Sequence, residues 1–184
     1  MKKRCEWAKD EPNTTYHDDE WGVPLHDDVT LFEFLILEGA QAGLSWSTIL
    51  NRRTGYRIAF SNFDVVAVSK YTQTDVKKLV ENKNIIRNKL KINSAINNAK
   101  QFIKIQKKFG SFDEYLWGFV NHKPIKNKFK KHSDLPCSSI MSEKLSQDLK
   151  KHGFTFVGPI ICYALMQAVG MVDDHTSNCF KYSK

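Results

Sequence analysis

An acidic residue close to an indole is the first feature of this sequence that could do chemistry. Glu38 follows an almost continuous apolar run at 31–37, and a carboxylate is rarely buried unless it is paired or used. Leu44 and Trp46 come within nine positions of it. A structural alternative also stays open, in which Glu38 pairs with an arginine or with a helix terminus. An acid, an apolar residue and an indole at this spacing are nevertheless more typical of a ligand pocket than of a core.

The local sequence predicts a sharp turn just after this acid. Gly43 suits the left-handed position that ends a helix, and Ser45 suits the N-cap of the next helix. We therefore expect a buried helix, capped by Asp27 or Asp28, to end near Gly43. A second helix should run from Ser45 to about Phe60.

Four residues that could bind a metal lie at the two ends of the chain: Cys5, His17, His175 and Cys179. Closed structural zinc sites take four cysteine or histidine ligands, and a single turn could close His175 and Cys179 on one ion. The spacing thus permits a zinc site that fastens both termini and leaves no position for an activated water. Free thiols and surface histidines are the alternative.

The rest of the chain reads as helical. Residues 5–22 indicate mostly loop, and only a few residues around 154–157 look strand-like. Elsewhere apolar spacing and capping residues predict helices at 62–68, 74–80, 88–107, 111–120, 140–151 and 158–170. Thr74 is expected to cap the helix at 74–80. We predict an all-α fold and one domain, 1–184, of two helical lobes that share a pocket, with segments 1–22 and 171–184 fastened by the metal.

The net charge of +8 over 184 residues favours a polyanionic partner, and nucleic acid is the usual one. A lysine-rich composition without such a partner explains the charge equally well. Five lysines lie between Lys123 and Lys131, inside the apparent loop 121–138. We interpret this loop as solvated surface rather than as a dedicated DNA contact.

The four cysteines are too widely spaced for a small disulfide framework, so we expect thiols or metal ligands. No apolar run is long enough to span a bilayer, and no apolar signal region follows the basic residues 2–4. We expect a cytoplasmic protein without a membrane partner.

Six blocks in order along nearly the whole chain resemble the 3-methyladenine DNA glycosylase I family. The blocks are Arg4-Cys5-x-Trp7, Tyr16-His17-Asp18-x-Glu20-Trp21-Gly22-Val23-Pro24, Leu37-Glu38-Gly39-x-Gln41-Ala42-Gly43-Leu44-Ser45-Trp46, Phe119-Val120-Asn121-His122, Phe156-Val157-Gly158 and Asp174-His175-x-x-x-Cys179. The resemblance implies an all-α helix-hairpin-helix glycosylase. Such an enzyme flips 3-methyladenine out of double-stranded alkylated DNA and hydrolyses its N-glycosidic bond. We expect it to act as a monomer.

The resemblance also implies roles for particular residues. It implies one structural zinc ion held by Cys5, His17, His175 and Cys179. It places a hairpin at 85–87, where backbone amides would face a DNA phosphate. The residues expected to contact DNA are Gly43, Leu44, Ile85, Ile86, Arg87 and Lys89, with Leu44 as the apolar wedge and Lys89, like Lys91, as a phosphate contact.

The chemistry of the lesion suggests how the pocket works. A glycosylase must turn the nucleotide out of the duplex, and 3-methyladenine in DNA is a cationic purine on a weakened bond. The rings of Tyr16, Trp21 and Trp46 attract cations. Our hypothesis is that Trp46 stacks on the base while Glu38, the expected catalytic residue, accepts hydrogen bonds from its N6 and N7 edge.

The sequence departs from related enzymes at two kinds of position. Between Arg87 and Gly110 there is no Asp or Glu, whereas many helix-hairpin-helix glycosylases have an aspartate there. This favours reliance on an unstable substrate and a discriminating pocket. Residues 13–15 replace a tyrosine-containing run, so one aromatic wall is expected to be missing, and Ala164 stands where a serine can occur.

Two other functions fit parts of the pattern. One is a non-catalytic DNA-binding sensor of alkylated bases that keeps the zinc and the hairpin. The other is a zinc hydrolase in which His17 or His175 belongs to an open site. Base release from methylated DNA distinguishes the first, and a ligand position held by water distinguishes the second.

Overall fold

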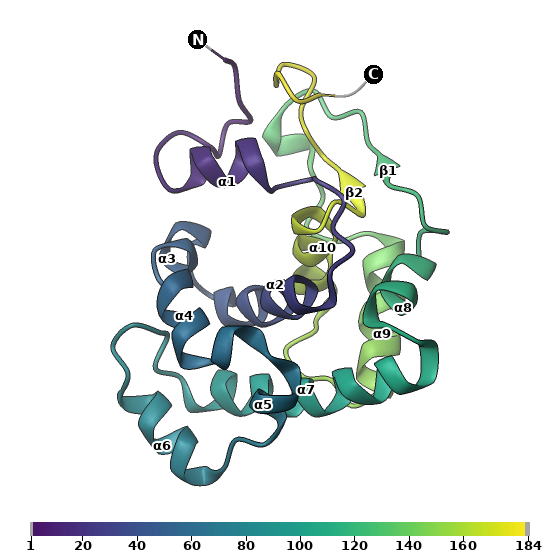
Figure 1. Ribbon diagram of the computed structural model, residues 1–184. Helices are drawn as coiled ribbons and strands as arrows, with labels where there is room; N and C mark the ends of the chain where they lie inside the picture. The colour runs from purple at the N-terminus through teal and green to yellow at the C-terminus, as the bar shows by residue number, and fades with distance from the viewer. Residues whose placement is uncertain (1, 183–184) are drawn as a thin grey trace.

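The computed structural model describes residues 2–182, which are mostly helical (Figure 1). Its α-helices are α1 (Asn13–Asp19), α2 (Asp28–Gln41), α3 (Trp46–Leu50), α4 (Arg53–Ala59), α5 (Val65–Ser69), α6 (Gln73–Glu81), α7 (Lys89–Phe109), α8 (Phe112–Gly118), α9 (Ile140–Lys151) and α10 (Pro159–Ala168). Two 3-10 helices, η1 (Ser61–Phe63) and η2 (His132–Asp134), and two short strands, β1 (Ile125–Lys126) and β2 (Val172–Asp173), complete the described elements.

Helix α2 lies at the centre of the molecule and contacts α3, α7, α8 and α10 (Figure 1). Leu31, Phe32 and Leu37 are fully buried, as expected for a helix that is apolar on nearly every side. Asp27 caps its start by accepting a hydrogen bond from the Thr30 amide at 2.9 Å. Just past its end, Gly43 adopts a φ of +79°, which confirms the predicted sharp turn.

Helix α7 is the longest described helix and packs against α5, α6 and α8. The side chain of Asn88 caps it by accepting from the Leu90 amide at 2.9 Å. Gly110, at a φ of +93°, ends it. The predicted long helix is confirmed and extends two residues further, to Phe109.

Several local predictions were wrong. Residues 13–19 form α1 instead of loop, and its buried side chains Tyr16 and His17 stabilise a helix too short to hold by propensity alone. The helix expected from Ser45 to Phe60 breaks at 51–52 into α3 and α4. Thr72, not Thr74, caps α6, because its amide and hydroxyl both donate to Asp75 Oδ2 at 2.8 Å.

The predicted loop 121–138 is not wholly irregular. It contains β1, which pairs in parallel with β2, so that Ile125 lies opposite Val172. It also contains η2. No strand forms at 154–157 in the described chain. A pairing between segments almost fifty residues apart leaves no local signal, which is why the sequence did not indicate it.

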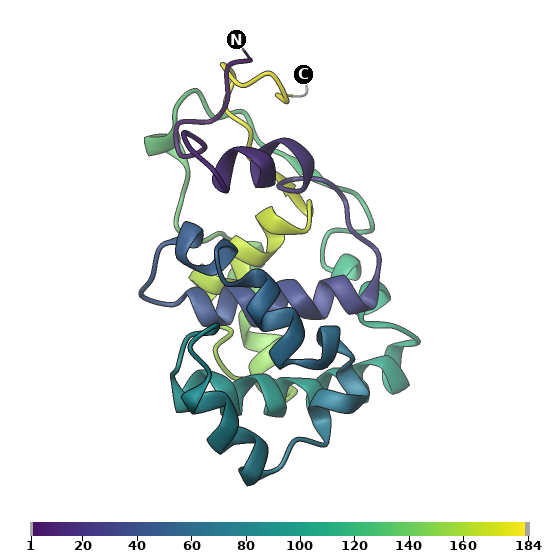
Figure 2. The same ribbon diagram turned by 60° about the vertical axis from the view of Figure 1, so that its left-hand side comes forward.

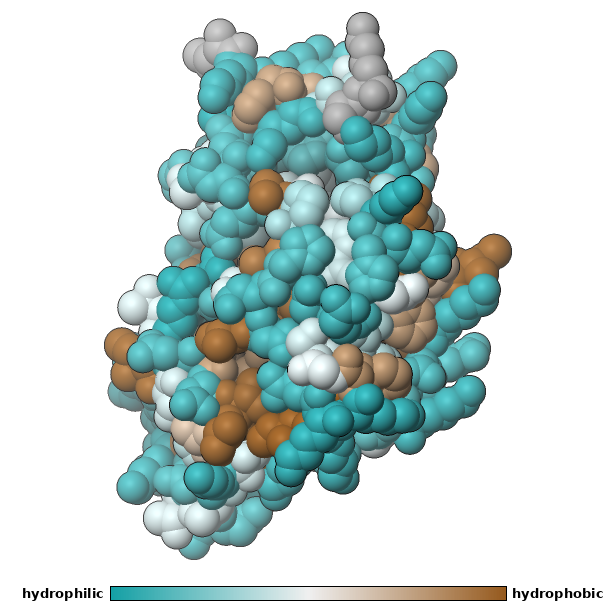
Figure 3. All heavy atoms as spheres, turned by 45° about the vertical axis from the view of Figure 1, so that its right-hand side comes forward, coloured by the Kyte–Doolittle hydropathy of each residue, from teal (hydrophilic) through white to brown (hydrophobic). Residues whose placement is uncertain are grey.

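The two ends of the chain meet at one end of the molecule (Figures 1 and 2). The Phe180 amide donates to the Lys3 carbonyl at 2.8 Å. Hydrophilic side chains cover most of the face in Figure 3, with smaller hydrophobic patches among them. Among residues 2–182, no helix combines the length and apolar character needed to cross a bilayer.

Candidate functional site: an aromatic cavity beside a cysteine–histidine cluster

A cavity of about 210 Å³ brings together residues from α1, α2, α3, α10 and η2 and from the connecting segments. Its walls are Trp7, Tyr16, Trp21, Glu38, Gln41, Trp46, His132, Leu135, Ala164 and Gln167. The structure therefore places all four residues predicted for the base pocket, from α1, α2, α3 and the turn after α1, around one space.

Aromatic rings form much of the wall. The ring centroids of Tyr16 and Trp46 lie 5.3 Å apart at an interplanar angle of 54°. Trp7 meets Trp21 edge to face at 5.1 Å and lies 6.1 Å from Tyr16. The Nε1 atom of Trp46 is buried and has no hydrogen-bond partner among the described residues. The wall thus offers ring faces and one unused donor.

Glu38 is the one acid in this wall, and its side chain is buried, with 4% of the residue exposed. Within residues 2–182 it makes no hydrogen bond or ion pair. Burial raises its pKa to about 8. Burial, followed by the charge of Glu38, also raises the pKa of Tyr16 well above its usual value. The interpretation that Glu38 pairs with an arginine is wrong, because Arg53 binds other acids.

Arg53 holds a separate ion-pair network with Glu33 of α2 and with Glu20. Its Nε lies 2.8 Å from Glu33 Oε1, and its Nη1 lies 2.7 Å from both carboxylate oxygens of Glu20. Arg57 binds the same Glu33 at 2.8 Å. Since these acids satisfy the nearby guanidinium groups, no cation is left for Glu38 in this part of the chain.

Five of the wall residues were not predicted from the sequence as pocket residues: Trp7, Gln41, His132, Leu135 and Gln167. Ala164, the position where a serine can occur, also lies in the wall. Gln41 could have been found, because it lies one turn after Glu38 on α2 and so shares its face. His132 and Leu135 could not, since the pairing of β1 with β2 sets their position. Gln167 is held by Asp174, whose Oδ2 accepts from its Nε2 at 2.8 Å.

The residues predicted to contact DNA differ in exposure. Leu44 is 39% exposed at the turn after α2, and Arg87 and Lys89 are exposed at the start of α7. Ile85, by contrast, is only 2% exposed.

The hairpin amides and one of the expected phosphate contacts are used inside the protein. The Ile85 amide donates to the Asn82 carbonyl at 3.4 Å, and the Ile86 amide donates to the Tyr56 hydroxyl at 3.2 Å. Both amides therefore already have hydrogen-bond partners within the protein. Lys91 is also not free, because its Nζ donates to the Ala40 and Ala42 carbonyls at the end of α2, at 2.8 and 2.6 Å.

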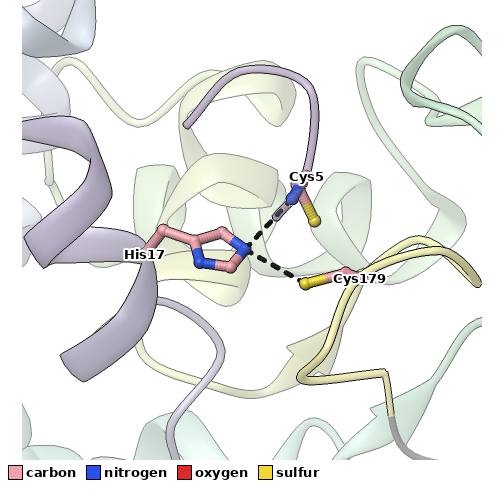
Figure 4. A group of neighbouring side chains, drawn as sticks. All are labelled: Cys5, His17 and Cys179. Atoms are coloured by element: carbon pink, nitrogen blue, oxygen red, sulfur yellow. Dashed lines mark hydrogen bonds between the residues drawn. The ribbon is translucent and has the colours of Figure 1, made fainter. Parts of the chain in front are cut away.

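Next to the cavity, three predicted metal ligands form a buried cluster. The ligand atoms of Cys5, His17 and Cys179 lie within 4.8 Å of one another. Figure 4 shows the imidazole pointing between the two sulfur atoms, and its Nε2 lies 3.3 Å from Cys179 Sγ. Trp21 links the cluster to the cavity by stacking on His17 at 6.0 Å. Burial raises the pKa of the Cys5 thiol to about 11.

The fourth predicted ligand, His175, lies outside this group of three but beside it. Its ring centroid is 5.1 Å from that of His17. Its Nδ1 is 2.7 Å from Asp173 Oδ1, while its Nε2 is buried without a hydrogen-bond partner among the described residues. His17 is oriented in the same way, with Nδ1 2.8 Å from Asp18 Oδ1. Both imidazoles therefore present Nε2 toward the same region.

Comparisons with known proteins agree on one family. Residues 7–182 match the family model described as methyladenine glycosylase. DNA-3-methyladenine glycosylase 1 of Escherichia coli (strain K12) is 44% identical over 181 residues, which cover 98% of this chain and 97% of that protein. A crystal structure of 3-methyladenine DNA glycosylase I matches with a TM-score of 0.95 at 41% identity, covering 98% of this chain and 100% of the other. The Staphylococcus aureus enzyme, whose structure addresses 3-methyladenine recognition, gives 0.94 at 36% identity over 98% and 97% of the two chains.

Proposed function

This chain belongs to the methyladenine glycosylase family, and we propose that it excises 3-methyladenine from alkylated DNA as a monofunctional glycosylase. The enzyme turns the damaged nucleotide out of the duplex and into the cavity. The N-glycosidic bond then breaks, and the base leaves with the bonding electron pair as neutral 3-methyladenine. Water adds to the sugar cation and loses a proton.

One observation carries this proposal: a buried acid without a partner lies in a cavity walled by aromatic rings. Glu38 is 4% exposed and has no cation within the described chain. An unpaired carboxylate in such a place is costly, so a positively charged ligand is the natural partner for it. The ring faces of Tyr16 and Trp46 favour a flat cation in the same space.

Selectivity follows from the same acid. A cationic purine keeps Glu38 ionised and paired, whereas neutral adenine leaves it protonated or unpaired. An unmade interaction of a buried polar group costs about 1–3 kcal/mol, or more for a charge. This penalty separates the lesion from the normal base, in addition to the weaker glycosidic bond of the lesion.

The chain offers little for strong acid–base catalysis of the bond cleavage itself. Of the residues that line the cavity, Glu38 is the one carboxylate, and α7 contains no acid. We infer that binding the cation and positioning its weakened bond supply most of the rate, with Glu38 as the residue that touches the base.

For the cysteine–histidine cluster we propose one structural zinc ion, held by Cys5, His17, His175 and Cys179. The donor set of two thiolates and two imidazoles suits Zn²⁺. The unused Nε2 of His175 and the carboxylates bound to both Nδ1 atoms also support it, because such carboxylates orient metal-binding histidines. All four residues are at most 5% exposed, so a substrate has no access to the ion, and a zinc hydrolase is not favoured.

We further propose that α6 and α7 with the turn at 82–88 form the helix-hairpin-helix element that holds DNA. Arg87 and Lys89 are its exposed cations, and Leu44 is the wedge that fills the space of the flipped base. Gly43, which needs its positive φ, lets the chain approach the duplex closely. Under this proposal the chain forms one domain with two lobes and acts on DNA as a monomer.

Chromatography of the free bases released from methylated duplex DNA tests this function. We expect the native protein to release 3-methyladenine and to leave normal adenine in the DNA. A matched sample without protein corrects for the spontaneous release of 3-methyladenine from the DNA. Binding to methylated DNA with no base release above that background would instead identify a non-catalytic sensor.

A further inference from the structure

A lysine-rich segment reaches the cavity from one side. Lys128, Lys130 and Lys131 are exposed, and the next residue, His132, lines the cavity together with Leu135. We define residues 127–135 as the lysine segment. The sequence alone favours solvated surface for this segment.

Hydrogen bonds fix the backbone of the lysine segment to the C-terminal part of the chain. The Asn127 amide donates to the Asp173 carbonyl at 3.0 Å, and its side chain donates to Asp174 Oδ1 at 2.7 Å. The Phe129 carbonyl accepts from the Ser177 amide at 2.9 Å. Because the backbone is already ordered, a ligand that binds the lysines pays no entropy for ordering this loop.

Two of the three lysines lie close along the chain to His132 of the cavity wall. Consecutive Cα atoms are about 3.8 Å apart, so the Cα atoms of Lys130 and Lys131 lie within about 8 Å of the Cα atom of His132. Figure 2 shows the 132–134 turn on the same side of the molecule as the turn between α2 and α3, which carries Leu44. Lys130 and Lys131 are thus next to a residue of the cavity wall, on the side of the molecule that carries the turn with Leu44.

We propose that Lys128, Lys130 and Lys131 bind the phosphates that flank the flipped nucleotide. This inference rests on the proposed function, since it takes duplex DNA as the substrate. A nucleotide in the cavity keeps its phosphates at the mouth, and lysine ammonium groups neutralise phosphates without reading sequence. The lysine segment is then a second DNA contact, separate from the turn at 82–88.

The test compares two triple variants of equal charge. The first is Lys128→Gln/Lys130→Gln/Lys131→Gln. The control is Lys104→Gln/Lys107→Gln/Lys108→Gln. Its exposed lysines lie in the last turns of α7, and in Figure 2 this end of α7 is at the edge of the molecule opposite the 132–134 turn. Anisotropy of a labelled, undamaged duplex gives the affinity of each protein as a function of salt concentration.

Each phosphate contact contributes about 0.9 to the slope of log affinity against log salt. We expect the slope of the first variant to be smaller than that of the native protein by about 2 to 3, and the control to keep the native slope. Equal slopes for the two variants would overturn the proposal. Both variants should stay folded at the assay temperature, because the changed side chains are exposed.

A second readout separates this inference from the proposed function. In single-turnover base release at low salt and saturating protein, the control variant should reach the native rate, because its lysines lie outside the cavity wall and outside the lysine segment. A native protein that releases no base would refute the glycosylase function whatever the salt slopes are. Native base release with equal slopes would refute only the role of the lysine segment.

Discussion

Glu33 and Glu38 lie five residues apart on α2 and are buried to the same degree, at 5% and 4% exposure, yet only Glu33 is ion-paired. Arg53 and Arg57 both reach Glu33 at 2.8 Å. Glu38 faces the cavity and has no cation within residues 2–182. One helix thus carries one acid that stabilises the fold and one that is available to a ligand.

The first prediction concerns Glu33. Glu33→Gln removes the negative charge that Arg53 and Arg57 share, and hydrogen bonds to charged groups contribute about 1.5–3 kcal/mol. We expect the free energy of unfolding in urea to fall by about 2–3 kcal/mol, while base release well below the melting temperature stays native. A loss of base release without a loss of stability would contradict this assignment.

The second prediction concerns the stability contributed by Glu38. Its pKa is raised from 4.5 to about 8 in the folded protein, so between these values the folded state holds a proton that the unfolded chain has lost. Stability must therefore fall as pH rises through this window. Glu38→Gln removes the effect and should be more stable than the native protein by on the order of 4 kcal/mol at pH 8.

Urea unfolding at two pH values checks this second prediction. Near pH 4, where the carboxyl is protonated in both states, the native protein and Glu38→Gln should differ little. The difference should grow toward pH 8. An identical difference at both values would show that Glu38 does not titrate as its burial requires.

The third prediction concerns the rate of base release. The cationic base needs an ionised Glu38, and the ionised fraction in the free protein rises with pH up to the pKa of about 8. With DNA well below saturation, kcat/KM should therefore rise about tenfold per pH unit below pH 7 and level off above pH 8. A native profile that is flat from pH 6 to 9 would rule out this role of the charge.

The fourth prediction concerns the metal. We expect one zinc per chain by metal analysis, lost in Cys5→Ser but kept in Cys137→Ser, whose thiol is exposed and distant from the cluster in sequence. Loss of a structural ion should lower Tm by about 10 °C. Base release at low temperature should persist, because the ion does not touch the base. Equal zinc content in the two variants would contradict the site.

Local signals explain what the sequence could predict. The caps at Asp27 and Ser45 and the turn at Gly43 depend only on neighbouring residues, and the structure confirms each of them. The grouping of Glu38 with its aromatic neighbours was also foreseeable, although it depended on a family resemblance for Tyr16 and Trp21.

Tertiary contacts explain what the sequence could not predict. The helix α1 exists because Tyr16 and His17 are buried, and the lysine segment is placed by a strand pair and by Asn127. The use of the Ile86 amide by Tyr56 depends on how α4 meets the turn at 82–88. None of these leaves a periodic or capping pattern.

The measurement that tests the account most directly is the rate of 3-methyladenine release from methylated DNA by Glu38→Gln, with Glu33→Gln as the matched buried control on the same helix. The loss of one charged contact to the base predicts a rate at least about tenfold lower for Glu38→Gln, with a folded protein and native-like DNA binding. The control should keep the native rate. A native rate for Glu38→Gln would contradict the claim that this unpaired acid recognises the damaged base.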